Sequence, residues 1–143
     1  MSADVSVGTD LDVDRSQLRH LCRAGQTNNI KELGEDLLRN AINSRDPITG
    51  YTALHSAAIF NRLDVIQLLL DYGAEIDIAG YRDGQTPFMK MARYAGGIRQ
   101  IQCAQLLIEY GADINYQDNH GNTGTDEIYF YAYTFLAVKN RCV

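Results

Sequence analysis

The sequence lacks any long apolar run. Hydrophobic residues make up 45% of its 143 residues, yet no stretch approaches the roughly 20 apolar residues that span a bilayer as a helix. Residues 1–14 are polar and acidic, without the basic start and apolar middle of a signal peptide or the arginine-rich character of a transit peptide. We therefore expect no membrane partner and an intracellular location, in the cytoplasm, the nucleus or both.

An excess of positive charge is also missing. Lys and Arg number 13 against 18 Asp and Glu, for a formal net charge of -5. Four aspartates and one arginine lie in residues 1–15, which gives that segment a charge of -3 and leaves -2 for the other residues. A near-neutral body lacks the basic footprint of a nucleic-acid-binding protein, so we expect no nucleic-acid partner. Residues 1–15 have few apolar groups to bury, and we expect a disordered tail whose deletion leaves the melting temperature nearly unchanged.

Cysteines are few and widely spaced. Cys22, Cys103 and Cys142 form no CxxC motif and no cluster with histidine. An odd, scattered set suits a reducing compartment in which thiols stay free. The spacing gives no metal site, and we expect no metal and no cofactor.

Two segments of the sequence recur. Residues 50–55 (GYTALH) align with 84–89 (GQTPFM) and with 121–126 (GNTGTD), and residues 68–77 (LLLDYGAEID) align with 106–115 (LLIEYGADIN). The initial glycines are 34 and 37 residues apart. The pattern closely resembles the ankyrin repeat, whose period is about 33 residues.

The resemblance implies a fold and a division of the chain. The fold is all-α: an ankyrin-repeat solenoid of stacked helix-turn-helix units with hairpin loops. The domain would cover residues 16–143, behind the tail at 1–15. Its repeats would cover about 16–45, 46–80 and 81–118, and a cap would cover 119–143 with one helix over 125–139. The first repeat matches weakly, and its polar residues fit an N-terminal capping unit whose outer face is wet.

The residues themselves indicate the helix boundaries. Thr86 and Pro87 form a helix start, because the hydroxyl caps free amides and proline suits the first helical position. Gly73 and Gly111 stand where a left-handed residue ends a helix. We expect helices at 53–60 and 63–72 in the second repeat, and one at 30–38 in the first.

The third repeat departs from the second in two ways. Met89 replaces His55, which in the family joins the preceding threonine in a hydrogen-bonded network. Four additional residues lie near 95–98, where two adjacent glycines, Gly96 and Gly97, favour a bulge between the helices.

No residue is predicted to be catalytic. His55 is better explained by the structural network than as a general base. His20 and Cys22, two apart on a helix, point to different faces. Cys103 is predicted to be a small buried hydrophobic residue. No phosphate-binding loop, nucleophile elbow or dinucleotide fingerprint is present.

The resemblance also implies a binding surface, because partners of ankyrin arrays usually contact the hairpin tips and the exposed side of the first helices. We call this surface the concave stripe. Arg and aromatic residues, the commonest interface anchors, are frequent on it, so the expected partner is a protein with an acidic or aromatic segment. The alternative is that Phe60 packs against the neighbouring repeat and the charges are merely solvated. The residues predicted for the stripe are Arg23, Arg45, Ile59, Phe60, Tyr81, Arg82, Lys90, Arg93, Tyr94, Asn119 and His120.

Asn115 stands at the hairpin position at which ankyrin proteins resemble known substrates of asparaginyl hydroxylation. A turn-stabilising asparagine is the other interpretation.

The expected function is that of a protein-protein interaction module, as an adaptor, inhibitor or scaffold. One alternative is a constitutive structural subunit of a larger assembly. Another is a pathogen-derived mimic of host ankyrin proteins. An enzyme would need a pocket with convergent polar groups, which the sequence does not indicate.

Overall fold

The computed structural model describes residues 15–93 and 97–125. It consists of stacked helix pairs joined by loops, with no strand in these two ranges. A helix over residues 15–24 comes first. It is followed by α2 (Thr27–Glu32), α3 (Glu35–Ala41), α4 (Ala53–Ile59), α5 (Leu63–Asp71), α6 (Pro87–Ala92) and α7 (Gly97–Glu109). The all-α ankyrin arrangement expected from the sequence is confirmed.

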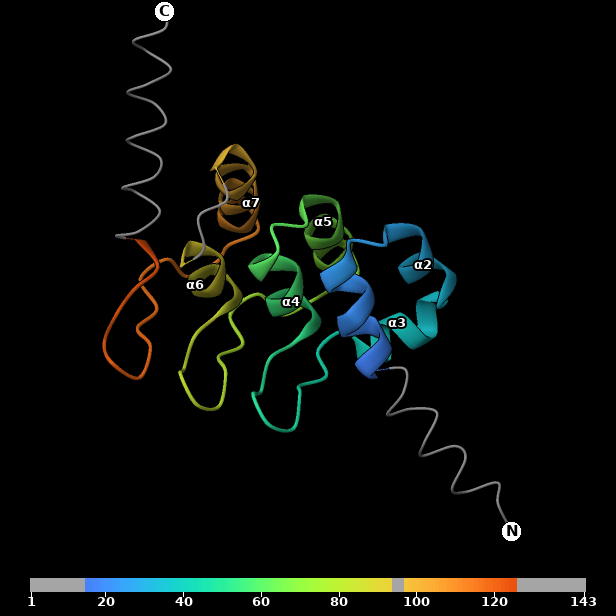
Figure 1. The fold of residues 1–143 in the computed structure, drawn as a ribbon, viewed down its shortest axis with the longest axis horizontal. Coiled ribbons are helices and arrows are strands. Elements are labelled where there is room, and N and C mark those ends of the chain that lie inside the picture. The colour runs from blue at the N-terminus through green and yellow to red at the C-terminus, as the bar shows by residue number, and fades with distance from the viewer. Residues whose placement is uncertain (1–14, 94–96, 126–143) are drawn as a thin grey trace, which may run out of the picture.

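The helices lie in two rows. The helix over 15–24, α4 and α6 form one row, and α2, α5 and α7 form the other (Figure 1). Three loops extend from the same side of the stack, one before α4, one before α6 and one after α7 (Figure 1). None of the described helices is long and apolar enough to cross a membrane.

The threonines begin the first helices as expected. Thr86 is the N-cap of α6, and its hydroxyl oxygen accepts a hydrogen bond from the Met89 amide at 3.4 Å. Thr52 is the N-cap of α4, where its own amide donates to Nδ1 of His55 at 3.0 Å. Gly73 and Gly111 follow the second helices with φ of 90° and 92°, a conformation that costs glycine little.

The core lies between the two rows. Leu54 of α4, Ile66 and Leu69 of α5, and Leu107 of α7 are completely buried. Helices this short cannot bury an apolar face by themselves, so their stability depends on contact with the neighbouring repeat. Phe88 extends the core into the third repeat, since it is 1% exposed.

The single helix expected over residues 30–38 is wrong. The chain forms α2 and α3 instead, with a break at Gly34, whose φ is 89°. A left-handed residue stops the right-handed path of a helix, and the Gly34 carbonyl then accepts from the Leu38 amide at 3.0 Å and starts α3. Ile30 lies in α2 and Leu38 in α3, so the apolar residues that suggested one helix belong to two.

The bulge expected near residues 95–98 is also wrong at Gly97 and Ile98. Both belong to the first turn of α7, which has 13 residues against 9 in α5. Gln100 is buried, and its side-chain amide donates to the Met91 carbonyl at 2.9 Å, which ties the start of α7 to the end of α6. The inserted residues therefore lengthen a helix. Ala95 and Gly96 lie outside the described residues, as do the tail at 1–14, Tyr94 and nearly all of the expected C-terminal helix.

The loops are joined to one another by backbone hydrogen bonds. The Tyr81 amide donates to the Thr49 carbonyl at 2.8 Å, and the Asn119 amide donates to the Asp83 carbonyl at 3.0 Å. Each loop therefore fixes the position of the next. Side chains at successive loop tips are held in a row by this ladder.

Candidate functional site

A groove lies between the helix over 15–24, the loop before α4, and the end of α4. Its volume is about 560 Å³. Charged and aromatic side chains come from all three elements, so the groove brings together parts of the first and second repeats. It is lined by Ser16, Arg19, His20, Arg23, Asp46, Thr49, Tyr51, Ser56, Ile59 and Phe60.

Arg23 and Phe60, two residues predicted for the concave stripe, lie side by side in this groove. The Arg23 guanidinium carbon lies 5.7 Å from the centroid of the Phe60 ring, within the range of a cation–π contact. Phe60 is 45% exposed and Ile59 is partly buried. The ring of Phe60 is thus partly covered by Arg23 of the first repeat and partly exposed to solvent, so both interpretations of Phe60 stay predictions.

Arg19 and Asp46 were not predicted as site residues, yet both line the groove. Nη2 of Arg19 lies 3.8 Å from Oδ2 of Asp46. Oδ1 of Asp46 accepts from the amides of Ile48 and Thr49, each at 2.9 Å. The hydrogen bonds from Thr49 and Ile48 lower the pKa of Asp46, because they favour the charged carboxylate. Arg19 and Arg23 are four residues apart, which places them on one face of a helix. This spacing was the signal in the sequence that could have identified Arg19 as a site residue.

Arg45 and Tyr81 lie together at the loops. The Arg45 guanidinium carbon is 4.2 Å from the Tyr81 ring centroid. Nε donates to the Gly50 carbonyl at 3.1 Å, and Nη2 donates to the carbonyl of Ala79. Arg45 thus connects two loops, and the 56% exposed ring of Tyr81 is held against it.

The remaining predicted loop residues are at the surface. Arg82, Asn119 and His120 are exposed. The Asn119 side-chain amide donates to the Arg82 carbonyl at 2.8 Å, so it also connects neighbouring loops.

Lys90 is less available than the sequence suggests. Its ammonium lies 2.7 Å from Oδ2 of Asp83, and its side chain is 12% exposed. The same ammonium lies 4.7 Å from the ring centroid of Tyr51, whose hydroxyl also donates to Asp83. Burial opposes ionisation of Asp83, but the hydrogen bonds from Lys90 and Tyr51 lower its pKa to about 2. Lys90 is therefore engaged within the protein.

Arg93 follows α6 as its C-cap and is exposed. It lines a second hollow of about 240 Å³ together with Met89, Asp118 and Thr123. Tyr94, the next residue of the predicted stripe, lies outside the described residues. The structure therefore disperses the predicted cations. Arg23 lines the first groove, Arg45 and Arg82 lie at the loops, Lys90 pairs with Asp83, and Arg93 lines the second hollow.

Asn115 is exposed in the turn after α7. Its backbone amide donates to Oδ1 of Asp113 at 3.0 Å. The turn is stabilised by this aspartate.

The residues considered for catalysis have structural roles. Nε2 of His55 is 2.9 Å from the Gln85 carbonyl oxygen, and burial lowers the pKa of His55 to about 4. Burial raises the pKa of Cys22 to about 12 and that of Cys103 to about 11, which leaves both as unreactive thiols. His20 is exposed, as expected for a helix face opposite Cys22. Within the described residues no group of His, Cys, Asp and Glu could hold a metal ion.

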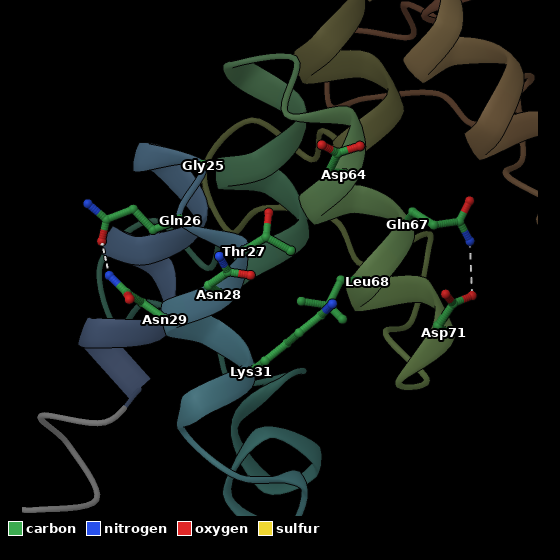
Figure 2. Close-up of a pocket in the computed structure, with 10 residues that line it drawn as sticks. All are labelled: Gly25, Gln26, Thr27, Asn28, Asn29, Lys31, Asp64, Gln67, Leu68 and Asp71. Carbon is green, nitrogen blue, oxygen red and sulfur yellow. Dashed lines mark hydrogen bonds between the residues drawn. The ribbon is translucent and has the colours of Figure 1, made fainter.

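A larger groove on the other row of helices was not predicted. It lies between α2 and α5, has a volume of about 760 Å³, and includes Asp64, Gln67 and Asp71 on one side (Figure 2). Lys31 extends from α2 toward α5 (Figure 2). The break at Gly34, which the sequence analysis missed, leaves α2 short beside α5.

Comparisons with known proteins identify the same repeat that the sequence and the fold indicate. A family model for ankyrin repeats, with three copies, matches residues 18–118. Ankyrin repeat and SOCS box protein 6 of Homo sapiens is 35% identical over 89 residues, which are 61% of this chain and 20% of that protein. The putative ankyrin repeat protein FPV031 of Fowlpox virus is 38% identical over 99 residues, which are 67% of this chain and 28% of that protein. The matched region thus spans between a fifth and a third of these relatives.

Proposed function

Because the chain belongs to the ankyrin-repeat family, we propose that it binds a partner protein through its concave stripe. Ankyrin repeats are generally protein-interaction modules, but the fold does not say where a partner sits. In this proposal the chain is an adaptor, inhibitor or scaffold in a reducing intracellular compartment. The partner would contact the first groove and the loop tips.

The exposed pair of Arg23 and Phe60 carries the proposal. An aromatic ring that is 45% exposed beside a guanidinium contributes little to the core. Such pairs are typical anchors in protein interfaces, where the ring becomes desolvated and the cation orients the partner. Tyr81 and Arg82 extend the same chemistry to the second loop.

The loop ladder supports a preformed surface. Arg45 and Asn119 bind carbonyl groups of neighbouring loops, so their role is to hold Tyr81 and Arg82 in place. Rigid presentation lowers the entropy lost on binding. Side chains predicted as contacts from the sequence therefore divide into those that would touch the partner and those that position them.

A constitutive subunit of a larger assembly is the second candidate. Apolar side chains are also exposed on α7 and just after it, where Ile98, Ile108 and Tyr110 are 55%, 47% and 44% exposed. A chain that uses both rows of helices would be enclosed in an assembly. Poor solubility of the isolated chain, cured by co-expression with its partner, would favour this candidate.

A pathogen-derived mimic of host ankyrin proteins is a variant of the first proposal. Relatives of the chain include viral ankyrin proteins from Fowlpox virus and from Acanthamoeba polyphaga mimivirus. The surface and its chemistry would be the same, and only the source of the partner would differ.

Asn115 is proposed as a site of hydroxylation on the family resemblance and its exposed position. Mass spectrometry of the protein from its native cell would detect a one-oxygen increase on the peptide containing Asn115. An unmodified peptide at full coverage would leave Asn115 as a turn residue.

Affinity capture tests the proposed function. The parent chain, Arg23→Glu and Arg99→Glu are each used as bait in a native lysate, and bound proteins are quantified by mass spectrometry. Arg99 is exposed on α7, in the other row of helices, and serves as the matched charge reversal. A partner retained by the parent and by Arg99→Glu but lost with Arg23→Glu supports the proposal. Equal recovery with all three baits contradicts it.

A further inference from the structure

Resting on the proposed function, we propose that the first groove binds an extended acidic peptide of the partner. In this peptide carboxylate side chains alternate with apolar ones. The helix over 15–24 would receive the carboxylates, and the end of α4 would receive the apolar side chains.

The first wall of the groove is cationic. Ser16, Arg19, His20 and Arg23 follow one another at spacings of three, one and three residues, which places them on one face of the helix. All four line the groove. Asp46 is the one acidic residue that lines it, and its carboxylate already accepts two backbone amides.

Arg19 retains an unused donor. Its Nη1 is buried and has no hydrogen-bond partner among the described residues, while Nη2 stands 3.8 Å from Asp46. A buried donor without an acceptor is costly, and a carboxylate is the acceptor that matches a guanidinium. A carboxylate in the groove would give the Arg19 guanidinium a closer acceptor than Asp46, which stands 3.8 Å away.

The spacing of the two arginines selects an extended peptide. Arg19 and Arg23 are four residues apart on a helix, a rise of about 6 Å. Side chains on one face of an extended strand repeat every second residue, about 6.6 Å apart. Carboxylates at alternate positions can therefore meet both arginines, whereas adjacent carboxylates would point to opposite sides.

The second wall is apolar. Ile59 and Phe60 line the groove from the end of α4, and Phe60 is 45% exposed. In an extended peptide the residues between the carboxylates face away from the arginines, toward this wall. Burial of an apolar side chain against Phe60 would add to binding and would not weaken the charge contacts.

The sequence offers a competing occupant. Residues 10–14 read Asp-Leu-Asp-Val-Asp, which is the same alternation. They lie just before the helix over 15–24. The experiment must therefore distinguish a separate peptide from this segment of the same chain.

Fluorescence anisotropy with the full chain provides the test. The probe is a fluorescein-labelled peptide in which three aspartates alternate with leucine and valine, and the control peptide has the same composition with its aspartates adjacent. We expect the alternating peptide to bind at least about tenfold more tightly, because one lost charge-assisted contact is worth about that factor. We also expect Arg23→Glu to weaken its binding about tenfold or more, and Arg99→Glu to leave it unchanged. Equal affinity of the two peptides, or indifference to Arg23→Glu, would overturn the inference.

A fourth protein, with Asp10, Asp12 and Asp14 all changed to Asn, shows whether residues 10–14 compete with the probe for the groove. An affinity for the probe equal to that of the parent supports a separate acidic peptide as the occupant. An increase of about tenfold would show that residues 10–14 fill the groove in the free chain, which overturns the assignment to a partner. If the probe fails but a captured partner still depends on Arg23, the peptide chemistry is wrong and the proposed function stands. If the probe binds but no captured protein depends on Arg23, the proposed function fails.

Discussion

Nε2 of His55 lies 2.9 Å from the carbonyl oxygen of Gln85, thirty residues further along the chain. The other ring nitrogen, Nδ1, accepts from the Thr52 amide at 3.0 Å. The neutral imidazole therefore accepts within its own repeat and donates to the next. A second proton would have to face the Thr52 amide, and burial further disfavours it.

Stability is predicted to fall between about pH 6.5 and about pH 4. Burial lowers the pKa of His55 from 6.5 to about 4, so below pH 6.5 the unfolded chain binds a proton that the folded chain does not. The contribution is fully present above the unfolded pKa and is lost as the pH falls through the folded pKa, for a total of about 3 kcal/mol. Urea denaturation at about pH 7.5 and about pH 4.5 measures the loss.

His55→Met is the matched control, because the third repeat has Met89 at the corresponding position. The variant should be less stable at neutral pH and should lose less on acidification. A parent whose stability is the same at both pH values would show that the imidazole is not held neutral. The aspartates whose pKa values are lowered, Asp46, Asp83 and Asp118, act below this window, because their unfolded pKa is 3.8.

Lys90→Met should destabilise the fold by about 1–3 kcal/mol, because it leaves the partly buried Asp83 carboxylate without its cation. Thermal unfolding of the variant beside the parent measures the effect. An unchanged melting temperature would mean that Lys90 is a free surface cation, as the sequence alone suggests.

Leu69→Ala and Leu107→Ala should each cost about 2–5 kcal/mol, the usual range for a leucine in a core. Both side chains are completely buried in α5 and α7. Gln105→Ala, an exposed position on α7, is the control and should melt like the parent. If the leucine variants also melted like the parent, the assigned register of the second helices would be wrong.

Phe60→Ala should lower the free energy of unfolding by well under the roughly 3–5 kcal/mol that a core phenylalanine costs, because the ring is 45% exposed. The same variant should weaken partner binding by about 2 kcal/mol or more if the ring is an interface anchor. Chemical denaturation gives the first value, and titration with the captured partner gives the second. A variant that unfolds would place Phe60 in the core.

Local signals in the sequence were sufficient for much of the fold. Some signals act through the backbone of only a few neighbouring residues, such as Thr86 before a proline and Gly73 and Gly111 after apolar helices. The structure confirms the helix start at Thr86 and the positive φ of both glycines. Gly34 was harder to interpret, because a glycine among leucines is compatible with both a weak helix and a break. The contact between α2 and α5 is a tertiary interaction, and the periodicity of one segment does not predict such an interaction.

The binding surface was predictable only in part. Repeat geometry indicated which positions face outward, and Arg23, Phe60 and Tyr81 are exposed. It did not indicate that Lys90 pairs with Asp83 or that Arg45 binds loop carbonyls, because those contacts join residues in neighbouring repeats. The role of Arg19 was missed for the same reason, as its ion pair joins it to Asp46 in the next repeat.

Arg62 is the N-cap of α5, in the second row, but is unsuitable as a control for charge reversal. Its Nε donates to the Arg23 carbonyl at 3.0 Å, and its side chain packs on Gly25. Reversal there would disturb the helix that carries Arg23. Arg99 lines a hollow with Gly25 and Arg62, but in the described part of the chain it makes no hydrogen bond or ion pair with the helix over 15–24.

The affinity of a captured partner for charge-reversed variants tests the concave stripe most directly. Dissociation constants are measured for the parent, Arg23→Glu, Arg93→Glu and Arg99→Glu, at low and high salt. We expect both stripe variants to bind about tenfold or more weakly, with slower association and a smaller dependence on salt, because exposed charges steer a partner of opposite sign. Arg99→Glu should bind like the parent. Equal affinities for all four proteins would contradict the stripe and direct the search to the groove between α2 and α5.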